Sequence, residues 1–450
     1  MNTAYERPPV IRIADADRTA LFAEGLEYNT PARGMWNIVH TGMLIPGAHQ
    51  VYACAQGCLR GVILTAAEMN ALDRMSWIAV SEQDLFDGTL EQSIIDGTAK
   101  IIGRLPVRPK VILLYLSCIH LFAGVDFSEI LAQLSERFPD IHFTDCYMTP
   151  TMRKTVSPAV KMAEQLYDAL RPLPVNAKSV NLIGNDRPTQ LDSELLRILR
   201  ENGFTVRDLT TCKTHADYLQ MAESALNLTY LPVGKRAGET LAKRLGTKHL
   251  HLPVSYNYDD IAANYRVLCE ALGIPCPDFS ADIAAAEAAL DTARRVIGQT
   301  PVVIDYTAVP YPFSLAEMLL AHGFSVRCVI ADSAAGEESA FDRLAAQYPD
   351  LEICQAVNVN MLHAHESALG EALCIGQKAA YYFASDRFVN IVMNGGFYGF
   401  AGIRALAEAM TDAYRNPKDR RTVLRHKGIG CPSCINSECG MNAAANPVGE

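Results

Sequence analysis

Two groups of cysteines have the residue types and spacing best suited to chemistry. Cys54 and Cys58 lie in the segment YACAQGCLRG, where two glycines flank Cys58, and Cys118 follows the apolar run VILLYLS. Thiolates bind zinc and iron–sulfur clusters, and glycines let the backbone approach a bulky ligand. Spacing alone leaves three interpretations of Cys54 and Cys58 open: an iron–sulfur site, a zinc site, or unligated thiols.

The second group lies near the carboxyl end of the chain, in the segment GCPSCINSECGMN. It contains Cys431, Cys434 and Cys439 among glycine, proline and asparagine residues. Three cysteines so close together in a polar segment are typical of a metal-binding loop. We therefore expect them to be metal ligands, with the fourth ligand unidentified; the alternative is a flexible tail with oxidation-prone thiols.

The chain has 13 cysteines in all. In a protein without a secretory signal this number favours reduced thiols or metal ligands over a disulfide framework. Free cysteine is among the most buried residue types. Five cysteines in apolar surroundings are therefore expected to pack in the core: Cys269, Cys276, Cys328, Cys354 and Cys374.

Alternating strand and helix patterns predict the elements that would hold these residues. We expect strands at 111–117, 179–184, 204–209, 225–231, 248–254, 301–306 and 324–331. We expect helices at 191–202, 236–246, 281–298, 314–323 and 403–416. This order is typical of an α/β fold with parallel sheets flanked by helices, in which ligands bind at the carboxyl ends of strands.

A chain of 450 residues is too long for one hydrophobic core. We expect an N-terminal cluster-binding α/β domain at 1–175 and a middle Rossmann-like domain with a linking helix at 176–298. A C-terminal Rossmann-like domain at 299–417 and a cysteine-containing tail at 418–450 complete the predicted organisation.

Charge and motifs exclude several classes of function. With 40 basic and 50 acidic residues the net charge is −10, which opposes nucleic-acid binding. No signal peptide or membrane-spanning run is present, so we expect a cytoplasmic protein. The chain has no G-x4-G-K-[ST] loop and is not expected to hydrolyse ATP itself.

Four stretches together resemble the nitrogenase component 1 type oxidoreductases, which include relatives that reduce protochlorophyllide and nickel-sirohydrochlorin. The stretches are CAQGCLRG (54–61), SEQDLFDGTLEQSIIDG (81–97), SCIHLFAGVDFSEI (117–130) and NGGFYGFAGIRALAEAMTDAYRNP (394–417). Their order and spacing carry the resemblance. It implies three Rossmann-like domains over nearly the whole chain.

The resemblance also implies a function. Cys54, Cys58 and Cys118 would bind an iron–sulfur cluster, 4Fe–4S or larger, near the interface with an identical or homologous subunit that supplies further ligands. A P-loop iron–sulfur reductase would use ATP and deliver electrons, making this chain one subunit of an oxidoreductase. The substrate and the catalytic residues stay open, as does the choice between homodimer and heterodimer.

The sequence departs from nitrogenases at the residues that ligate their active-site cofactor. Tyr230 or its neighbours, and the segment 386–393, stand where nitrogenases have a cysteine and a histidine, so dinitrogen reduction is not expected. The upstream Gly-Cys-Ala element is replaced by Gly42, Met43 and Leu44, which leaves the cluster nuclearity open. The main alternative is a non-catalytic scaffold on which a metallocluster is assembled.

Overall fold

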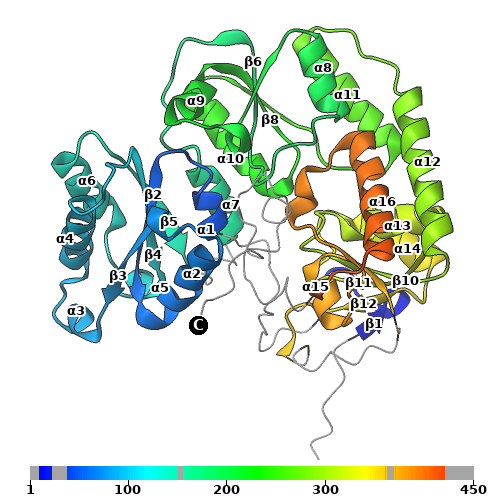
Figure 1. Ribbon diagram of the computed structural model, residues 1–450, viewed down its shortest axis with the longest axis horizontal. Helices are drawn as coiled ribbons and strands as arrows, with labels where there is room; N and C mark the ends of the chain where they lie inside the picture. Colours follow the sequence, from blue (N-terminus) through cyan, green and yellow to red (C-terminus); the bar gives the residue numbers. More distant parts are fainter. Residues whose placement is uncertain are drawn as a thin grey trace, which may run out of the picture. The chain divides into compact units, whose positions relative to one another are not determined.

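The computed structural model describes residues 10–22, 38–149, 156–359, 361, 369 and 371–420, and its described strands form three sheets (Figure 1). The chain divides into two compact units. One contains 36–188 and 203–251, and the other contains 1–35, 189–202 and 252–450. No described helix is both long and apolar enough to cross a membrane.

The first sheet is parallel, with strand order β3-β2-β4-β5. Its strands are β2 (Ala48–Ala55), β3 (Met75–Val80), β4 (Val111–Ser117) and β5 (His142–Met148). The associated helices are α1 (Ile38–Gly42), α2 (Gln56–Glu68), α3 (Glu82–Phe86), α4 (Leu90–Ile102), α5 (Cys118–Phe122) and α6 (Phe127–Arg137). Every residue of β4 is buried, which explains its uninterrupted apolar sequence.

The second sheet belongs to the same unit and is also parallel, with order β7-β6-β8-β9. Its elements are β6 (Asn176–Leu182), β7 (Thr205–Asp208), β8 (Ser224–Thr229), β9 (Lys248–His251), α9 (His215–Leu219) and α10 (Pro232–Leu245). A Cβ atom on Gly184 would lie 2.2 Å from the Cα atom of Gly234. Only glycine therefore allows the turn after β6 to approach α10 this closely.

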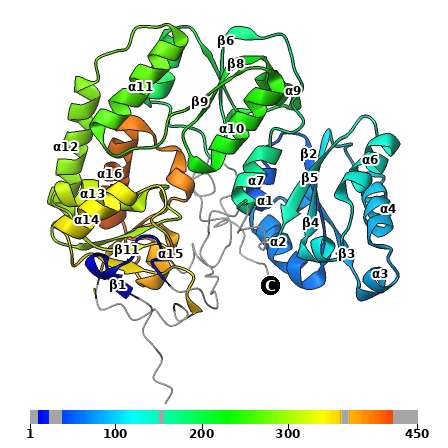
Figure 2. The ribbon, with the colours of Figure 1, turned by 180° about the vertical axis from the view of Figure 1, so that it is seen from behind.

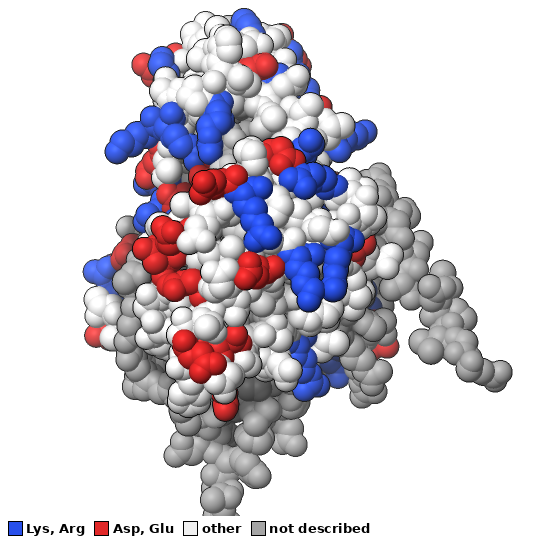
Figure 3. Space-filling view, turned by 90° about the vertical axis from the view of Figure 1, so that its left-hand side faces the viewer, with Lys and Arg blue, Asp and Glu red and all other residues white. Residues whose placement is uncertain are grey.

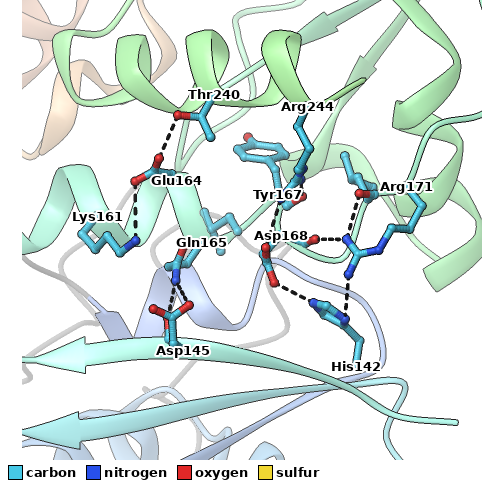
Figure 4. Close-up of polar contacts among 12 residues, drawn as sticks. His142, Asp145, Lys161, Glu164, Gln165, Tyr167, Asp168, Arg171, Thr240 and Arg244 are labelled. Carbon is cyan, nitrogen blue, oxygen red and sulfur yellow. Dashed lines mark hydrogen bonds and ion pairs between the residues drawn. The ribbon is translucent and has the colours of Figure 1, made fainter. Parts of the chain in front are cut away.

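Polar contacts join the first sheet to the second through α7 (Pro158–Gln165), the segment after it and α10 (Figure 4). Asp168 accepts from Arg244 at 3.0 Å, and its other carboxylate oxygen lies 2.7 Å from His142 Nε2. Glu164 accepts from the Thr240 hydroxyl at 2.8 Å. Because these carboxylates lie between the two α/β layers of one unit, they fix α10 against α7.

The third sheet, in the other unit, has six strands in the order β1-β12-β11-β10-β13-β14. Two of them, β1 and β11, are labelled in Figure 2. The strands are β1 (Val10–Arg12), β10 (Pro301–Asp305), β11 (Ser325–Ile330), β12 (Glu352–Cys354), β13 (Leu373–Ile375) and β14 (Phe388–Val389). Its helices are α13 (Pro312–Ala321), α14 (Glu338–Gln347), α15 (Gln377–Tyr382) and α16 (Gly399–Arg415). Only β1, drawn in blue, is antiparallel to its neighbour among these strands.

Three further helices pack in this second unit: α8 (Glu194–Glu201), α11 (Tyr258–Leu272) and α12 (Ser280–Ile297). The buried Glu194 carboxylate accepts from the Tyr265 hydroxyl at 3.0 Å and from the Ala401 backbone N–H at 2.9 Å. These bonds hold α8 and α11 to the start of α16, because a buried carboxylate is costly without donors.

The structure confirms the α/β class, the parallel sheets and each predicted helix and strand to within a few residues. The domain boundaries stay a prediction. Two elements lie in a different unit from the one that these boundaries imply. The strand β1 joins the third sheet, and α8, at 194–201, groups with the C-terminal residues. Strand pairing and the Glu194 bonds join residues distant in sequence, so periodicity could not reveal either feature.

Candidate metal centre

The three N-terminal cysteines come together at the carboxyl end of the first sheet. Cys54 is the penultimate residue of β2, Cys58 lies in the first turn of α2, and Cys118 is the first residue of α5. β2 and β4 are neighbours in register, with Ala53 opposite Leu116. Cys54 thus lies at a strand end, and Cys58 and Cys118 lie at helix starts, because both helices begin directly after their strands.

We call these three cysteines the thiol triad, and the charge of one affects the ionisation of another. Burial, followed by the proximity of Cys58 and Cys118, raises the pKa of Cys54 to about 12. Burial and the proximity of Cys118 also raise the pKa of Cys58. Without a cation, ionised neighbours therefore oppose the ionisation of Cys54 and Cys58, and a bound metal ion would reverse that effect by favouring thiolates.

The thiol triad opens towards solvent on one side. Cys54 is buried, Cys118 is half-buried and Cys58 is exposed. Added Cβ atoms on Gly57 or Gly61 would meet nothing within 4 Å, so the space beside the first turns of α2 is open. The α2 N-cap, Ala55, makes no side-chain capping bond, which leaves the partial positive charge of the helix start free to favour thiolate or another anion.

Two histidines lie close to the triad cysteines in the sequence, but they have different positions in the fold. His49 is near the start of β2, five residues before Cys54, and its Nε2 lies 2.9 Å from the Ser76 hydroxyl. At about 3.3 Å per residue it is roughly 16 Å along the strand from Cys54, too far to share a ligand. His120 is buried beside Cys118, with Nδ1 3.2 Å from the Ser117 N–H, and its Nε2 has no hydrogen-bond partner among the described residues.

Exposed apolar side chains lie at the same end of the sheet. Phe122 on α5 is 75% exposed, and Phe86 on α3, which follows β3, is 81% exposed. Leu85 and Leu121, beside them in the sequence, are also exposed. We call these four residues the apolar rim. The sequence analysis missed it, although paired apolar residues at the ends of two short helices were a signal.

Other residues of the resembling stretches have structural roles. Gly124 adopts φ +70°, and Asp126 caps α6 by accepting from the Glu129 N–H at 3.1 Å. Ser81 and Asp84 form a reciprocal capping box at α3. These residues set where the helices after β3 and β4 begin, and thereby position the ends of those strands.

A second polar group lies at the carboxyl end of the third sheet. We call Asp305, Tyr306, Asp332 and Lys378 the carboxylate cluster. The fully buried Asp305 accepts from the Thr307 N–H and hydroxyl, each at 2.8 Å, and from the Lys378 N–H at 2.7 Å. Lys378 Nζ donates to the Tyr306 hydroxyl at 3.2 Å. Burial raises the pKa of Asp305, although Lys378 and these donors oppose that effect.

Over the described residues, no group of three or more His, Cys, Asp or Glu side chains has the arrangement of a preformed metal site. The donor chemistry of the thiol triad nevertheless fits an iron–sulfur cluster: three sulfur ligands, open space over two glycines and an uncapped helix start. Cys431, Cys434 and Cys439 lie outside the described residues.

The face of the molecule in Figure 3 carries both signs of charge. Blue and red side chains are interleaved over its described residues. Ion pairs of the first sheet's layer include Arg137 with Asp96 at 3.3 Å and Arg108 with Asp140 at 2.5 Å. Such exposed pairs contribute little to stability but keep the outer helical layer polar.

Comparison with known proteins identifies the class. The family model for the nitrogenase component 1 type oxidoreductases matches residues 39–415, so the chain belongs to this family. It is an oxidoreductase family, and the resemblance of the sequence is confirmed.

Solved structures show the same fold. The structure titled "Nitrogenase Cp1 at pH 6.5" matches with a TM-score of 0.67 and 14% identity, covering 89% of this chain and 96% of the other. "Nitrogenase Cp1 at pH 5" matches with a TM-score of 0.57 and 13% identity, covering 91% and 94%. No curated protein sequence matches the chain.

Proposed function

We propose that this chain is a subunit of a nitrogenase-like reductive complex in which Cys54, Cys58 and Cys118 bind an iron–sulfur cluster. The observation that carries the proposal is the convergence of three thiols from β2, α2 and α5 at the open carboxyl end of one parallel sheet. Membership of the component 1 family supports it. The substrate is a molecule still to be identified.

The residues of the site have distinct tasks. Cys54 would anchor the group from inside the sheet, whereas Cys118 and Cys58 would hold it nearer the surface. The start of α2 would stabilise negative charge on the sulfur ligands, and the open space over Gly57 and Gly61 would accommodate the group's bulk. A bound cluster would supply one-electron storage and transfer.

The carboxyl end of the first sheet also exposes a surface to which a partner chain could bind. The apolar rim exposes two phenylalanines beside a site to which the described residues contribute three thiols, and exposed apolar groups of this kind mark protein–protein contacts. We propose that a second component 1-type chain, identical or homologous, covers the rim and supplies the remaining ligands. A separate ATP-dependent iron–sulfur reductase would deliver electrons, and ATP would bind only to that reductase.

The exposed position of Cys58 also suits the alternative function, a scaffold that assembles a metallocluster and passes it on. A ligand at the surface can be reached by an acceptor protein. Incubation of the iron-loaded chain with an apo-ferredoxin distinguishes the two functions. Rapid transfer of iron and sulfide favours the scaffold, and retention of the cluster favours the reductase subunit.

Anaerobic purification with iron and acid-labile sulfide analysis, and EPR of the dithionite-reduced protein, tests the cluster itself. We expect iron and sulfide in similar amounts in the parent protein and a large loss of both in Cys118→Ala. Cys212→Ala is the matched control, because Cys212 is a half-buried thiol of the same unit outside the triad. A parent protein that contains no iron, or zinc alone, would contradict the proposal.

The three C-terminal cysteines need their own test. Cys431, Cys434 and Cys439 stay proposed metal ligands, and their simultaneous replacement by serine should remove additional metal while leaving the EPR signal of the triad unchanged. If the metal content of the triple variant equals that of the parent, these cysteines are not ligands.

A further inference from the structure

The first sheet ends on one side in β3, a strand whose outer edge has no partner strand among the described residues. All of β3 pairs with β2 in an uninterrupted parallel register, from Met75 opposite Gln50 to Val80 opposite Ala55. Backbone groups alternate between the two sides of a strand, so about half of the β3 N–H and C=O groups point away from β2. These groups form a regular edge to which another strand can bind.

β3 lacks the features that usually prevent edge strands from pairing. Its sequence, MSWIAV, contains no charged residue, histidine or proline. Among the described residues the three sheets have five other edge strands, and one of these, β14, is only two residues long. The other four each contain a charged side chain: Arg12 in β1, Asp145 in β5, Arg207 in β7 and Lys248 in β9. Charge and short length both protect an edge, and β3 has neither.

Apolar side chains extend this edge on one face of the strand. Trp77 is 46% exposed, and Ala79, two residues later and therefore on the same face, is exposed as well. Ile78 lies on the opposite face against α4, where a Cβ atom on Gly97 would be 2.8 Å from the Ile78 Cδ1 atom. Leu64, on the helix α2 that covers the other side of β3, is 48% exposed (Figure 1). An exposed tryptophan beside an unpaired edge is typical of a protein interface.

The charges beside β3 differ in sign between its two ends. Glu82 and Asp87 are exposed and follow the carboxyl end of the strand. Lys100 and Arg104 are exposed at the far end of α4, which leads to the start of the parallel strand β4, so both lie towards the amino end of the sheet. Asp73 is also at the amino end, where these two cations outnumber it. Two antiparallel copies of the edge therefore place each acidic end against a basic end, whereas parallel copies place like charges together.

We propose that two copies of this chain associate through β3 in antiparallel orientation, so that their two four-stranded sheets form one continuous sheet. The occupant of the edge is a second copy because the edge is complementary in charge to itself, and a twofold contact uses the same patch on both chains. The outward backbone groups pair, and Trp77 of each copy loses contact with water. The contact uses neither the thiol triad nor the apolar rim, so it goes beyond the proposed function.

Sedimentation velocity of the metal-free, full-length protein over a series of concentrations tests the proposal. We expect a dimer for the parent. For Trp77→Lys we expect a dissociation constant at least about tenfold higher, because a lysine in this contact loses its hydration without gaining an opposite charge. Leu191→Lys is the matched control and should stay dimeric, since Leu191 is 77% exposed and belongs to the other unit. A parent that is monomeric at about 100 µM would overturn the proposal.

Hydrogen exchange measured by mass spectrometry locates the contact. The amides of residues 75–80 should exchange more slowly in the parent dimer than in Trp77→Lys, whereas those of the central strand β4 should not differ. Equal exchange of residues 75–80 in a parent dimer and in Trp77→Lys would overturn the proposal. Far-UV circular dichroism should show that the variant is folded. If it is not, Ala79→Lys, which alters the other exposed side chain of β3, takes its place.

A variant of the apolar rim distinguishes this contact from the one proposed for the cluster. Phe122→Asp should leave the β3 dimer intact, because Phe122 lies on α5 and not at the edge of the sheet. A dimer that dissociates in Phe122→Asp but persists in Trp77→Lys would place the contact at the rim and overturn the proposal. Iron content is not part of either readout, so this outcome is independent of the proposed cluster.

Discussion

The thiol triad and the carboxylate cluster occupy the same kind of position, the carboxyl ends of neighbouring parallel strands, but they differ in how their polar groups are satisfied. Asp305 is fully buried and receives three hydrogen bonds from its own chain. Cys58 is exposed, and the space over Gly57 is open. The carboxylate cluster is thus an internal support of the fold, whereas the thiol triad has one exposed thiol beside open space, which suits the cluster binding proposed for it.

The largest expected effect is on stability, at the carboxylate cluster. Asp305→Ala removes the acceptor for the Thr307 and Lys378 N–H groups and leaves the buried Lys378 without the opposite charge at Asp305. Loss of a buried charged partner costs about 3–5 kcal/mol. Urea unfolding measures this loss, and iron bound per folded molecule should not change. If Asp305→Ala were as stable as the parent but bound less iron, the carboxylate cluster would support metal binding and not the stability of the fold.

Two glycines, one beside the carboxylate cluster and one beside the thiol triad, allow the packing of the two regions to be compared directly. Gly376 has φ +111°, and its added Cβ would lie 2.7 Å from the Asp305 Cβ, so Gly376→Ala should cost roughly 2–3 kcal/mol. Gly57→Ala adds a methyl group where nothing lies within 4 Å and should change the unfolding free energy by less than about 0.5 kcal/mol. Both values come from urea unfolding of the two variants; equal losses would contradict the difference in packing.

Asp305 should also contribute to the pH dependence of stability, together with Asp208 and Glu337, whose pKa values burial raises to about 6 and about 7. Burial raises the pKa of Asp305, so the folded protein keeps this proton at pH values where the unfolded chain, with a pKa of about 3.9, has released it. Stability should therefore fall as pH rises from about 4 towards the folded pKa, by at most about 1.4 kcal/mol per pH unit.

Asp305→Asn should make this slope shallower by removing the Asp305 contribution, because its amide does not ionise. Urea unfolding of parent and variant between about pH 4 and pH 7 measures the difference. The exposed Asp350 provides the control Asp350→Asn, which should keep the parent slope. Parallel profiles for the parent and Asp305→Asn would show that another group causes the pH dependence.

The smallest expected effect is at the triad in the metal-free protein. Cys58→Ser changes an exposed side chain and should alter the unfolding free energy by less than about 0.5 kcal/mol, while lowering bound iron in the loaded protein. Thermal unfolding of metal-free samples, with iron analysis of loaded samples, separates the two effects. A large loss of stability without metal would make Cys58 a structural residue and weaken the comparison.

The sequence by itself determined the α/β class, seven of the strands and five of the helices, and the family, because periodicity and local motifs are encoded in neighbouring residues. It also identified Cys54, Cys58 and Cys118 as candidates. Only the tertiary structure decided which cysteines are accessible: Cys276 is exposed and Cys354 is buried, although both have apolar neighbours in the sequence.

Long-range contacts explain the other features that the sequence did not predict. The apolar rim depends on which faces of α3 and α5 remain uncovered, and β1 finds its partner β12 more than 300 residues away along the chain. The bonds of Glu194 to Tyr265 and Ala401 likewise join distant segments. Exposure and pairing are set by packing between elements, so these features required the folded chain, whereas the strands and helices with clear periodicity did not.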